Sequence, residues 1–174
     1  VPDKVEEQHS LALDLWSKLV TNEKTDIYLR SSDGDAIPAH KLLLSFRSPV
    51  LAQLIETTNG VLTLEVTTQI LKSLLQYMYT DRVDPLDSPQ VLIRFADSLE
   101  LPGLKSICER ELIDSITPQN VASLLLVADT FNCELLKKAC MGYCEDNPHS
   151  IVKTVAWKVM EKVNPGLFEE VCQK

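Results

Sequence analysis

Apolar residues recur along the chain with the spacing of an α-helix. Residues 11–19 carry leucines four positions apart, and comparable stripes follow in the segments 70–78, 91–99, 121–128 and 135–143. Positions three and four apart lie on one face of a helix, so each stripe predicts an amphipathic helix. An apolar face is stable in water only when another element covers it, and the repeated stripes therefore predict a packed helical body.

Dipeptides that join a polar residue to proline predict where several helices begin. Ser, Thr or Asn can accept hydrogen bonds from the free N–H groups of a first helical turn, and proline suits the first helical position because that position needs no donor. Leu101-Pro102 predicts a further start without a polar cap. The capped starts are Ser48-Pro49, Ser88-Pro89, Thr117-Pro118, Asn147-Pro148 and Asn164-Pro165.

Strand patterns are confined to the first half of the chain. Residues 26–30 and 36–38 flank a turn-rich stretch with an Asp-Gly pair, which predicts a β-hairpin. Residues 61–64 predict a third short strand. Short strands beside many helices predict an α+β fold, and from residue 102 onward the pattern is helical throughout.

The charge distribution argues against nucleic-acid and membrane partners. The 174 residues carry a formal net charge of −8, and basic residues are interleaved with acidic ones. Phosphate groups and anionic lipid surfaces both attract clustered Lys and Arg, which this chain lacks. Its apolar runs are too short to cross a bilayer. We therefore expect neither nucleic acid nor a membrane among its partners.

The cysteines and the missing catalytic motifs argue against a metal site and an enzyme. The five cysteines mostly fall in helical patterns, which favours buried free thiols in a reducing compartment, the nucleus or the cytoplasm. Cys140 and Cys144 share a helical face with His149 beyond, but a closed zinc site needs four ligands and CxxC spacing is missing. Since no phosphate loop, nucleophile elbow or metal-ligand helix is visible, we expect no metal, no cofactor and no catalytic residues.

The order of short motifs over residues 8–114 resembles the BTB/POZ domain family. Each motif alone is weak, but the set appears in order and at about the family spacing. The motifs are Thr25-Asp26-Ile27-Tyr28-Leu29, Ala39-His40-Lys41-Leu42, Arg47-Ser48-Pro49 and Tyr77-Met78-Tyr79-Thr80-Asp81. The resemblance implies an α+β BTB/POZ fold, a small β-sheet flanked by helices, over residues 1–116. Residues 117–174 resemble the all-helical three-box or partial BACK region of the family's speckle-type branch.

The resemblance also implies two interaction sites. Cullin-binding members carry a hydrophobic-x-Glu motif after the third helix, which Leu54-Ile55-Glu56 matches, so these residues are expected to bind the N-terminal region of cullin-3, with Tyr79 beside them. The first helix of the family packs across a two-fold axis, which implies a homodimer. The residues expected at that dimer interface are Leu11, Leu15, Trp16 and Leu19.

Simpler interpretations of the same residues stay open. Leu54 could be an ordinary core residue with Glu56 on the surface, and the first helix could fold back on its own core. Asp26 and His40 could suggest a catalytic pair, but in the BTB fold they stand at a strand start and a helix start, where polar side chains cap free backbone groups.

The function implied is that of a substrate adaptor of a cullin-3 ubiquitin ligase. The chain would bind the cullin on one face, pair with a second copy, and rely on a domain outside this sequence to hold the protein substrate. The alternative is a dimeric scaffold that recruits transcriptional corepressors. Relatives of that kind usually carry zinc fingers after a bare BTB domain, whereas a helical region follows here.

Overall fold

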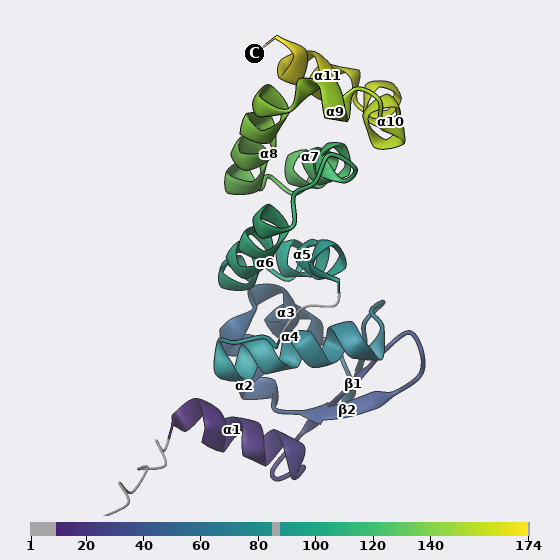
Figure 1. The fold of residues 1–174 in the computed structure, drawn as a ribbon. Helices are drawn as coiled ribbons and strands as arrows, with labels where there is room; N and C mark the ends of the chain where they lie inside the picture. The colour runs from purple at the N-terminus through teal and green to yellow at the C-terminus, as the bar shows by residue number, and fades with distance from the viewer. Residues whose placement is uncertain (1–9, 85–87, 174) are drawn as a thin grey trace, which may run out of the picture. The chain divides into compact units, whose positions relative to one another are not determined.

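The computed structural model describes residues 10–84 and 88–173, which form two compact units (Figure 1). The first unit holds residues 10–84 with 98–101, and the second holds residues 88–97 with 102–173. The elements are, in chain order, α1 (Leu11–Val20), β1 (Ile27–Arg30), β2 (Ala36–Ala39), α2 (Lys41–Arg47), α3 (Pro49–Glu56), β3 (Val61–Thr63), α4 (Thr68–Thr80), α5 (Pro89–Ser98), α6 (Pro102–Asp114), α7 (Val121–Thr130), α8 (Glu134–Asp146), α9 (Pro148–Ile151), α10 (Val155–Val163) and α11 (Pro165–Cys172).

A small sheet with the strand order β2-β1-β3 forms the centre of the first unit. β1 and β2 form the predicted antiparallel hairpin, whereas β3 runs parallel to β1. The Ser31 N–H donates to the Asp35 carbonyl at 2.8 Å and closes the hairpin turn. Gly34 in this turn has a φ of 98°, which side chains with a Cβ rarely adopt. The predicted α+β fold is therefore confirmed.

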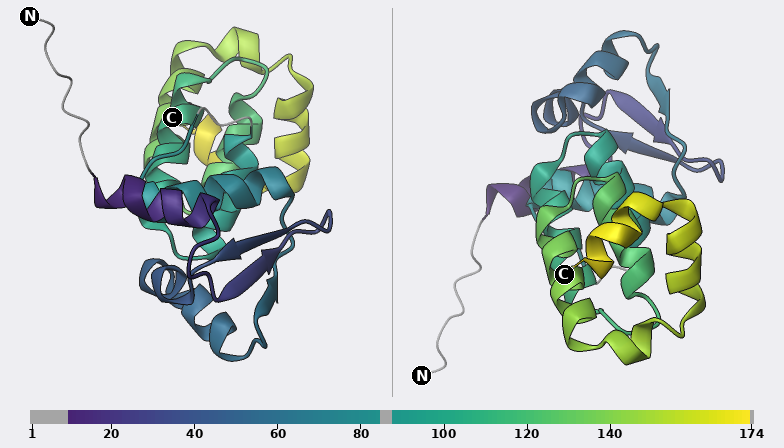
Figure 2. Two further views of the ribbon diagram at one scale, coloured as in Figure 1. Left: turned by 90° about the horizontal axis from the view of Figure 1, so that it is seen from below. Right: turned by 90° about the horizontal axis from the view of Figure 1, so that it is seen from above.

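The core of the first unit is built from buried residues of the sheet, α2, α3 and α4. Ile27 and Leu29 of β1 are buried while Tyr28 between them is exposed, as the alternation of a strand requires. The stripe predicted in residues 70–78 forms the buried face of α4, and α1 lies along the same helix (Figures 1 and 2). This packing fixes α1 on the body of the unit.

Five of the six predicted helix starts are confirmed at their proline. α3, α5, α6, α9 and α11 begin at Pro49, Pro89, Pro102, Pro148 and Pro165. Ser48 Oγ accepts the Leu51 N–H at 3.1 Å, and Asn164 Oδ1 accepts the Leu167 N–H at 3.1 Å, as capping requires.

The predicted start at Thr117-Pro118 is wrong. A turn occupies residues 118–120 and α7 begins at Val121. The side chain of Asn120 stabilises this turn, because its Oδ1 accepts the Thr117 N–H at 2.7 Å and its Nδ2 donates to the Ser115 carbonyl at 2.8 Å.

The second unit is an assembly of helices in which α7 packs against both α8 and α10 (Figure 2). A polar network reinforces this packing. Lys137 Nζ lies 3.0 Å from carboxylate oxygens of both Asp129 and Glu170, and Asn164 Nδ2 donates to Asp129 at 3.0 Å. These bonds join α7, α8, α11 and the residue before α11.

The compact units do not coincide with the boundary expected from the sequence. The motif pattern predicts a boundary between residues 116 and 117, whereas α5 and α6 pack with the later helices. The predicted boundary separates two stretches of sequence that resemble different domain families, whereas the compact units are defined by packing. The predicted boundary therefore stays a prediction. Among the described residues, no helix is both long and apolar enough to cross a membrane.

Candidate protein-interaction surfaces

An apolar hollow of about 810 Å³ lies between α1, α2 and the end of α4. We name it the α1–α2 hollow. Leu42 is 70% exposed and Phe46 is 81% exposed, although both are large apolar side chains. The other side chains lining it are Leu11, Ala12, Leu15, Leu43, Met78 and Tyr79, with Lys24, Asp26, His40, Arg47 and Asp81 supplying the polar groups. A concentration of exposed apolar surface of this kind is typical of a protein-interaction site.

The leucine stripe of α1 passes from solvent into the core along the helix. Leu11 is 76% exposed, Leu15 is half-buried, and Leu19 is only 5% exposed. Leu19 therefore anchors α1 to its own unit and offers little surface to a second copy. Trp16 is also half-buried, and its ring lies edge-on to Tyr79 with the centroids 6.1 Å apart. The dimer interface stays a prediction, and Leu11, Leu15 and Trp16 are the members that keep exposed surface.

Tyr79 is a buried residue at the base of the hollow and offers little surface to a partner. Its side chain is 4% exposed, and its hydroxyl accepts the His40 backbone N–H at 3.1 Å and bonds His40 Nδ1 at 2.7 Å. Burial raises the pKa of Tyr79 to about 12. His40 Nε2 bonds the Glu23 carbonyl at 2.8 Å, so the ring of His40 joins the end of α4 to the loop after α1.

The interpretation of Asp26 and His40 as capping residues is half correct. Asp26 Oδ1 accepts the Lys41 N–H at 2.8 Å and caps α2 as expected. The His40 side chain makes no cap bond to α2, because Tyr79 and Glu23 occupy its ring nitrogens.

Arg47 forms part of the polar rim of the α1–α2 hollow. It pairs with Asp81, which ends α4 in a left-handed conformation, and its guanidinium carbon lies 5.1 Å above the centre of the Tyr77 ring. Arg47 Nε is buried without a hydrogen-bond partner in the described part of the chain. The rim therefore carries both charges of an ion pair.

The residues expected to bind the cullin lie at the end of α3 and differ in exposure. Leu54 is 37% exposed and Glu56 is exposed, whereas Ile55 is 7% exposed and belongs to the core. The hydroxyls of Thr57 and Thr58 donate to the Leu54 carbonyl at 2.9 and 2.7 Å and hold this helix end in place. Leu54 and Glu56 are thus available to a partner, and their role stays a prediction.

Sequence reasoning missed two strongly exposed members of the hollow, Leu42 and Phe46. They stand four positions apart on α2, which places them on one face, while Leu44 between them is fully buried. The run Leu42-Leu43-Leu44-Ser45-Phe46 is too uniformly apolar for its periodicity to separate the inner face from the outer one. Their four-residue spacing was the available signal.

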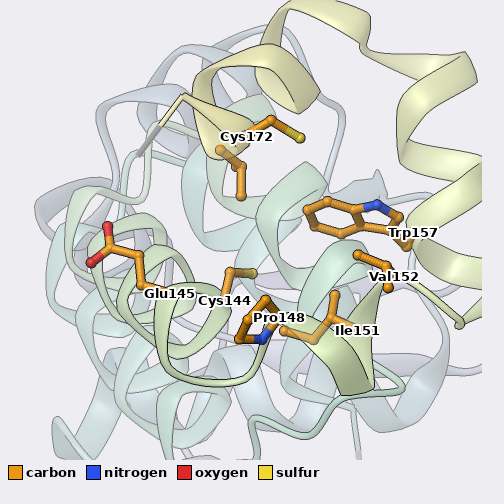
Figure 3. A pocket seen from close by; sticks show the side chains of 8 residues that line it. Cys144, Glu145, Pro148, Ile151, Val152, Trp157 and Cys172 are labelled. Atoms are coloured by element: carbon orange, nitrogen blue, oxygen red, sulfur yellow. The ribbon is translucent and has the colours of Figure 1, made fainter.

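A second hollow, of about 370 Å³, lies within the second unit and is shown in Figure 3. Trp157, Ile151 and Val152 line it, together with the thiols of Cys144 and Cys172. Burial raises the pKa of Cys144 to about 11, which keeps that thiol protonated at neutral pH and makes it a poor nucleophile. No group of three or more potential metal ligands is present among the described residues.

Residues 17–116 were compared with models of known protein families. They match the model of the BTB/POZ domain. The mouse TD and POZ domain-containing protein 2 is 31% identical over 98% of this chain and 49% of its own length, and the Caenorhabditis elegans protein maternal effect lethal 26 is 26% identical over 90% of this chain and 42% of its own length. This chain therefore spans about half the length, or less, of these relatives. The BTB domain of zebrafish PATZ1 shares the fold, with a TM-score of 0.53 and 20% identity over 60% of this chain and 89% of that one.

Proposed function

This chain belongs to the BTB/POZ domain family, and on that premise we propose that it is a homodimeric substrate adaptor of a cullin-3 ubiquitin ligase. A BTB/POZ domain is a protein-interaction domain, so the chain acts by bringing other proteins together. The observation that carries the proposal is that apolar residues stay exposed at the α1–α2 hollow and at the end of α3. Two separate exposed surfaces suit an adaptor that holds a second copy and a ligase scaffold at once.

The α1–α2 hollow is the surface we assign to the second copy. Leu11, Leu42 and Phe46 are each at least 70% exposed, and a two-fold axis would bury all three on both subunits. Burying a large apolar side chain contributes about 1.5–3 kcal/mol, so six side chains contribute roughly 9–18 kcal/mol. That range is comparable to the 4–15 kcal/mol, approximately, that association costs in lost freedom of motion. A dimer through this surface is therefore energetically reasonable.

The end of α3 is the surface we assign to the N-terminal region of cullin-3. Leu54 would supply an apolar anchor, and Glu56 would supply a charge at the edge of the contact. The buried side chain of Ile55, between them, holds this end of α3 on the core of the unit. Tyr79 is 4% exposed and can touch a partner very little. It would therefore act indirectly, by holding α2 and α4 in place. We further propose that helices of the second unit make contacts of their own with the cullin.

The proposed mechanism is geometric and requires no catalytic residue. A domain outside this sequence would hold the protein substrate, the cullin would carry the ubiquitin-transfer machinery, and dimerisation would double the number of substrate and ligase sites and raise their effective concentration. We place this activity in the nucleus or the cytoplasm, where the five free thiols would stay reduced.

Binding of the purified chain to the N-terminal region of cullin-3, measured by isothermal titration calorimetry, tests the proposal. We expect Leu54→Asp and Glu56→Lys each to weaken binding by about tenfold, because a tenfold loss corresponds to about 1.4 kcal/mol, the scale of one interface side chain. Glu65→Lys is the matched control, since it makes the same charge change at an exposed position of the same unit.

Two results would contradict the assignment. Unchanged affinity in both α3 variants would remove this site, even if the cullin bound elsewhere. Binding of corepressor peptides to a dimer that shows no affinity for the cullin would replace the adaptor function with that of a transcriptional scaffold.

A further inference from the structure

α10 carries a stripe of exposed valines along its outer face. Val155, Val159 and Val163 are four residues apart and are 78%, 45% and 66% exposed. Residues with this spacing lie on one side of a helix. We name them the α10 valine stripe.

The fold of the second unit does not explain the stripe. The inner face of α10 is filled by Trp157, which points into the hollow of Figure 3 with its ring 5.2 Å from that of Phe168, and by the fully buried Met160. β-Branched residues are also poorer helix formers than Ala, Lys or Glu, so exposed valines do not help the helix itself. A face that serves neither the core nor the helix is a candidate for binding.

Two lysines run along one edge of the stripe. Lys158 and Lys162 are exposed and four positions apart, and each stands three residues after a valine of the stripe. Within the described residues, neither lysine forms an ion pair. Glu161 is two positions from the nearest valines and therefore points away from the stripe. The edge is thus positive, on a chain whose net charge is −8.

The size of the stripe indicates a small partner. Its three valines expose on the order of 300 Å², well below the roughly 800 Å² per partner that a stable interface between rigid domains buries. Pairing of two stripes in a second copy of this chain would leave Lys158 and Lys162 without a matching carboxylate, because the stripe itself supplies none. A single helix of opposite charge satisfies both the area and the edge.

We propose that the α10 valine stripe binds an acidic amphipathic helix of a partner protein. Apolar side chains of that helix would pack between the valines, and a row of Asp or Glu beside them would pair with Lys158 and Lys162. The site lies in the second unit and does not depend on the cullin assignment, so each can fail without the other.

The test uses two designed peptides and the full 174-residue chain. Both peptides are alanine-rich helices with three leucines four residues apart; one carries glutamates along the edge of its leucine row and the other carries lysines. Two-dimensional ¹⁵N NMR spectra follow the amides of the chain as peptide is added. We expect the glutamate peptide to shift the α10 amides with a Kd of about 0.1–1 mM, a range typical of a few side chains, and the lysine peptide to bind at least about tenfold more weakly.

Matched variants locate the site. Val159→Asp should abolish the shifts, whereas Val91→Asp, a valine of α5 with the same 45% exposure, should leave them unchanged. The double variant Lys158→Glu with Lys162→Glu should reverse the preference between the two peptides. Circular dichroism of each variant confirms that it is folded.

Three outcomes would overturn the proposal. The first is the absence of α10 shifts at millimolar glutamate peptide. The second is self-association of the chain that Val159→Asp removes without any peptide, which would assign the stripe to a second copy. The third is binding to vesicles containing anionic phosphatidylserine that depends on Val159, which would assign the stripe to a membrane surface.

Discussion

Replacing Tyr79 by phenylalanine isolates the polar link that holds the first helices of the chain together. The substitution keeps the ring, which lies edge-on to Trp16, and removes only the hydroxyl. That hydroxyl accepts the His40 N–H at 3.1 Å and bonds His40 Nδ1 at 2.7 Å. The Tyr79→Phe variant would leave both His40 groups without this partner, beside a side chain that is 4% exposed.

The expected loss follows from the two hydrogen bonds. Each bond contributes about 0.5–1.5 kcal/mol net, and an unpaired buried group costs about 1–3 kcal/mol, so we expect the free energy of unfolding of the first unit to fall by roughly 2–3 kcal/mol. For a chain of this size, such a loss lowers Tm by roughly 4–12 °C. Because His40 also bonds the Glu23 carbonyl, the loop after α1 should loosen together with α2.

Urea unfolding followed by tryptophan fluorescence measures this loss, and hydrogen exchange of the Leu44 amide, which donates to the His40 carbonyl, localises it. The control is Tyr28→Phe, since Tyr28 is 45% exposed and its hydroxyl makes no hydrogen bond within the described residues. A loss below about 0.5 kcal/mol for Tyr79→Phe, equal to that of the control, would refute the assigned role of the hydroxyl.

Three further predictions concern charge and burial. Because burial raises the pKa of Tyr79 to about 12 in the folded chain, against about 10 in the unfolded one, stability should fall as pH rises between these values, and Tyr79→Phe should show a smaller fall in urea titrations. Hydrogen bonds from Ser31 and Thr68 lower the pKa of Asp33 to about 2. The stability that the Asp33 carboxylate contributes is therefore present above the ordinary pKa of 3.8 and is lost as pH falls toward 2. The Asp33→Asn variant should flatten this part of the acid unfolding curve. Glu109→Ala should lower the free energy of unfolding by about 1–3 kcal/mol in thermal unfolding, because the buried Glu109 carboxylate accepts a backbone N–H at the start of α8. Its control is Glu111→Ala, on the exposed side of the same helix, which should lower the free energy of unfolding by less than about 0.5 kcal/mol.

Local chemistry made much of the fold predictable from the sequence. The hairpin follows from strand alternation around an Asp-Gly turn, and most helix starts follow from a polar residue before proline, as Ser48 and Asn164 show. Thr117-Pro118 failed because Asn120, three residues later, stabilises a turn instead. The parallel pairing of β3 with β1 was not predicted, since no local signal specifies which strand a distant segment joins.

The candidate sites were predictable as segments but not residue by residue. The stripe on α1 indicated an interaction helix, yet only tertiary packing decides that Leu11 is exposed and Leu19 is buried. The same packing buries Ile55 and Tyr79, which the motif pattern had grouped with exposed Leu54. Where one face of a helix ends and the next begins depends on what lies against it, and the sequence of that helix does not contain this information.

The central claim is that the exposed apolar surface of the α1–α2 hollow is covered by another copy of the chain. Sedimentation equilibrium at micromolar concentration tests it most directly, using the native chain, Leu42→Asp, and Leu13→Asp as an exposed leucine of α1 outside the α1–α2 hollow. We predict twice the 19.5 kDa of one chain for the native protein and for Leu13→Asp, and 19.5 kDa for Leu42→Asp. A native mass of 19.5 kDa, or a dimer that Leu42→Asp leaves intact, would contradict the account.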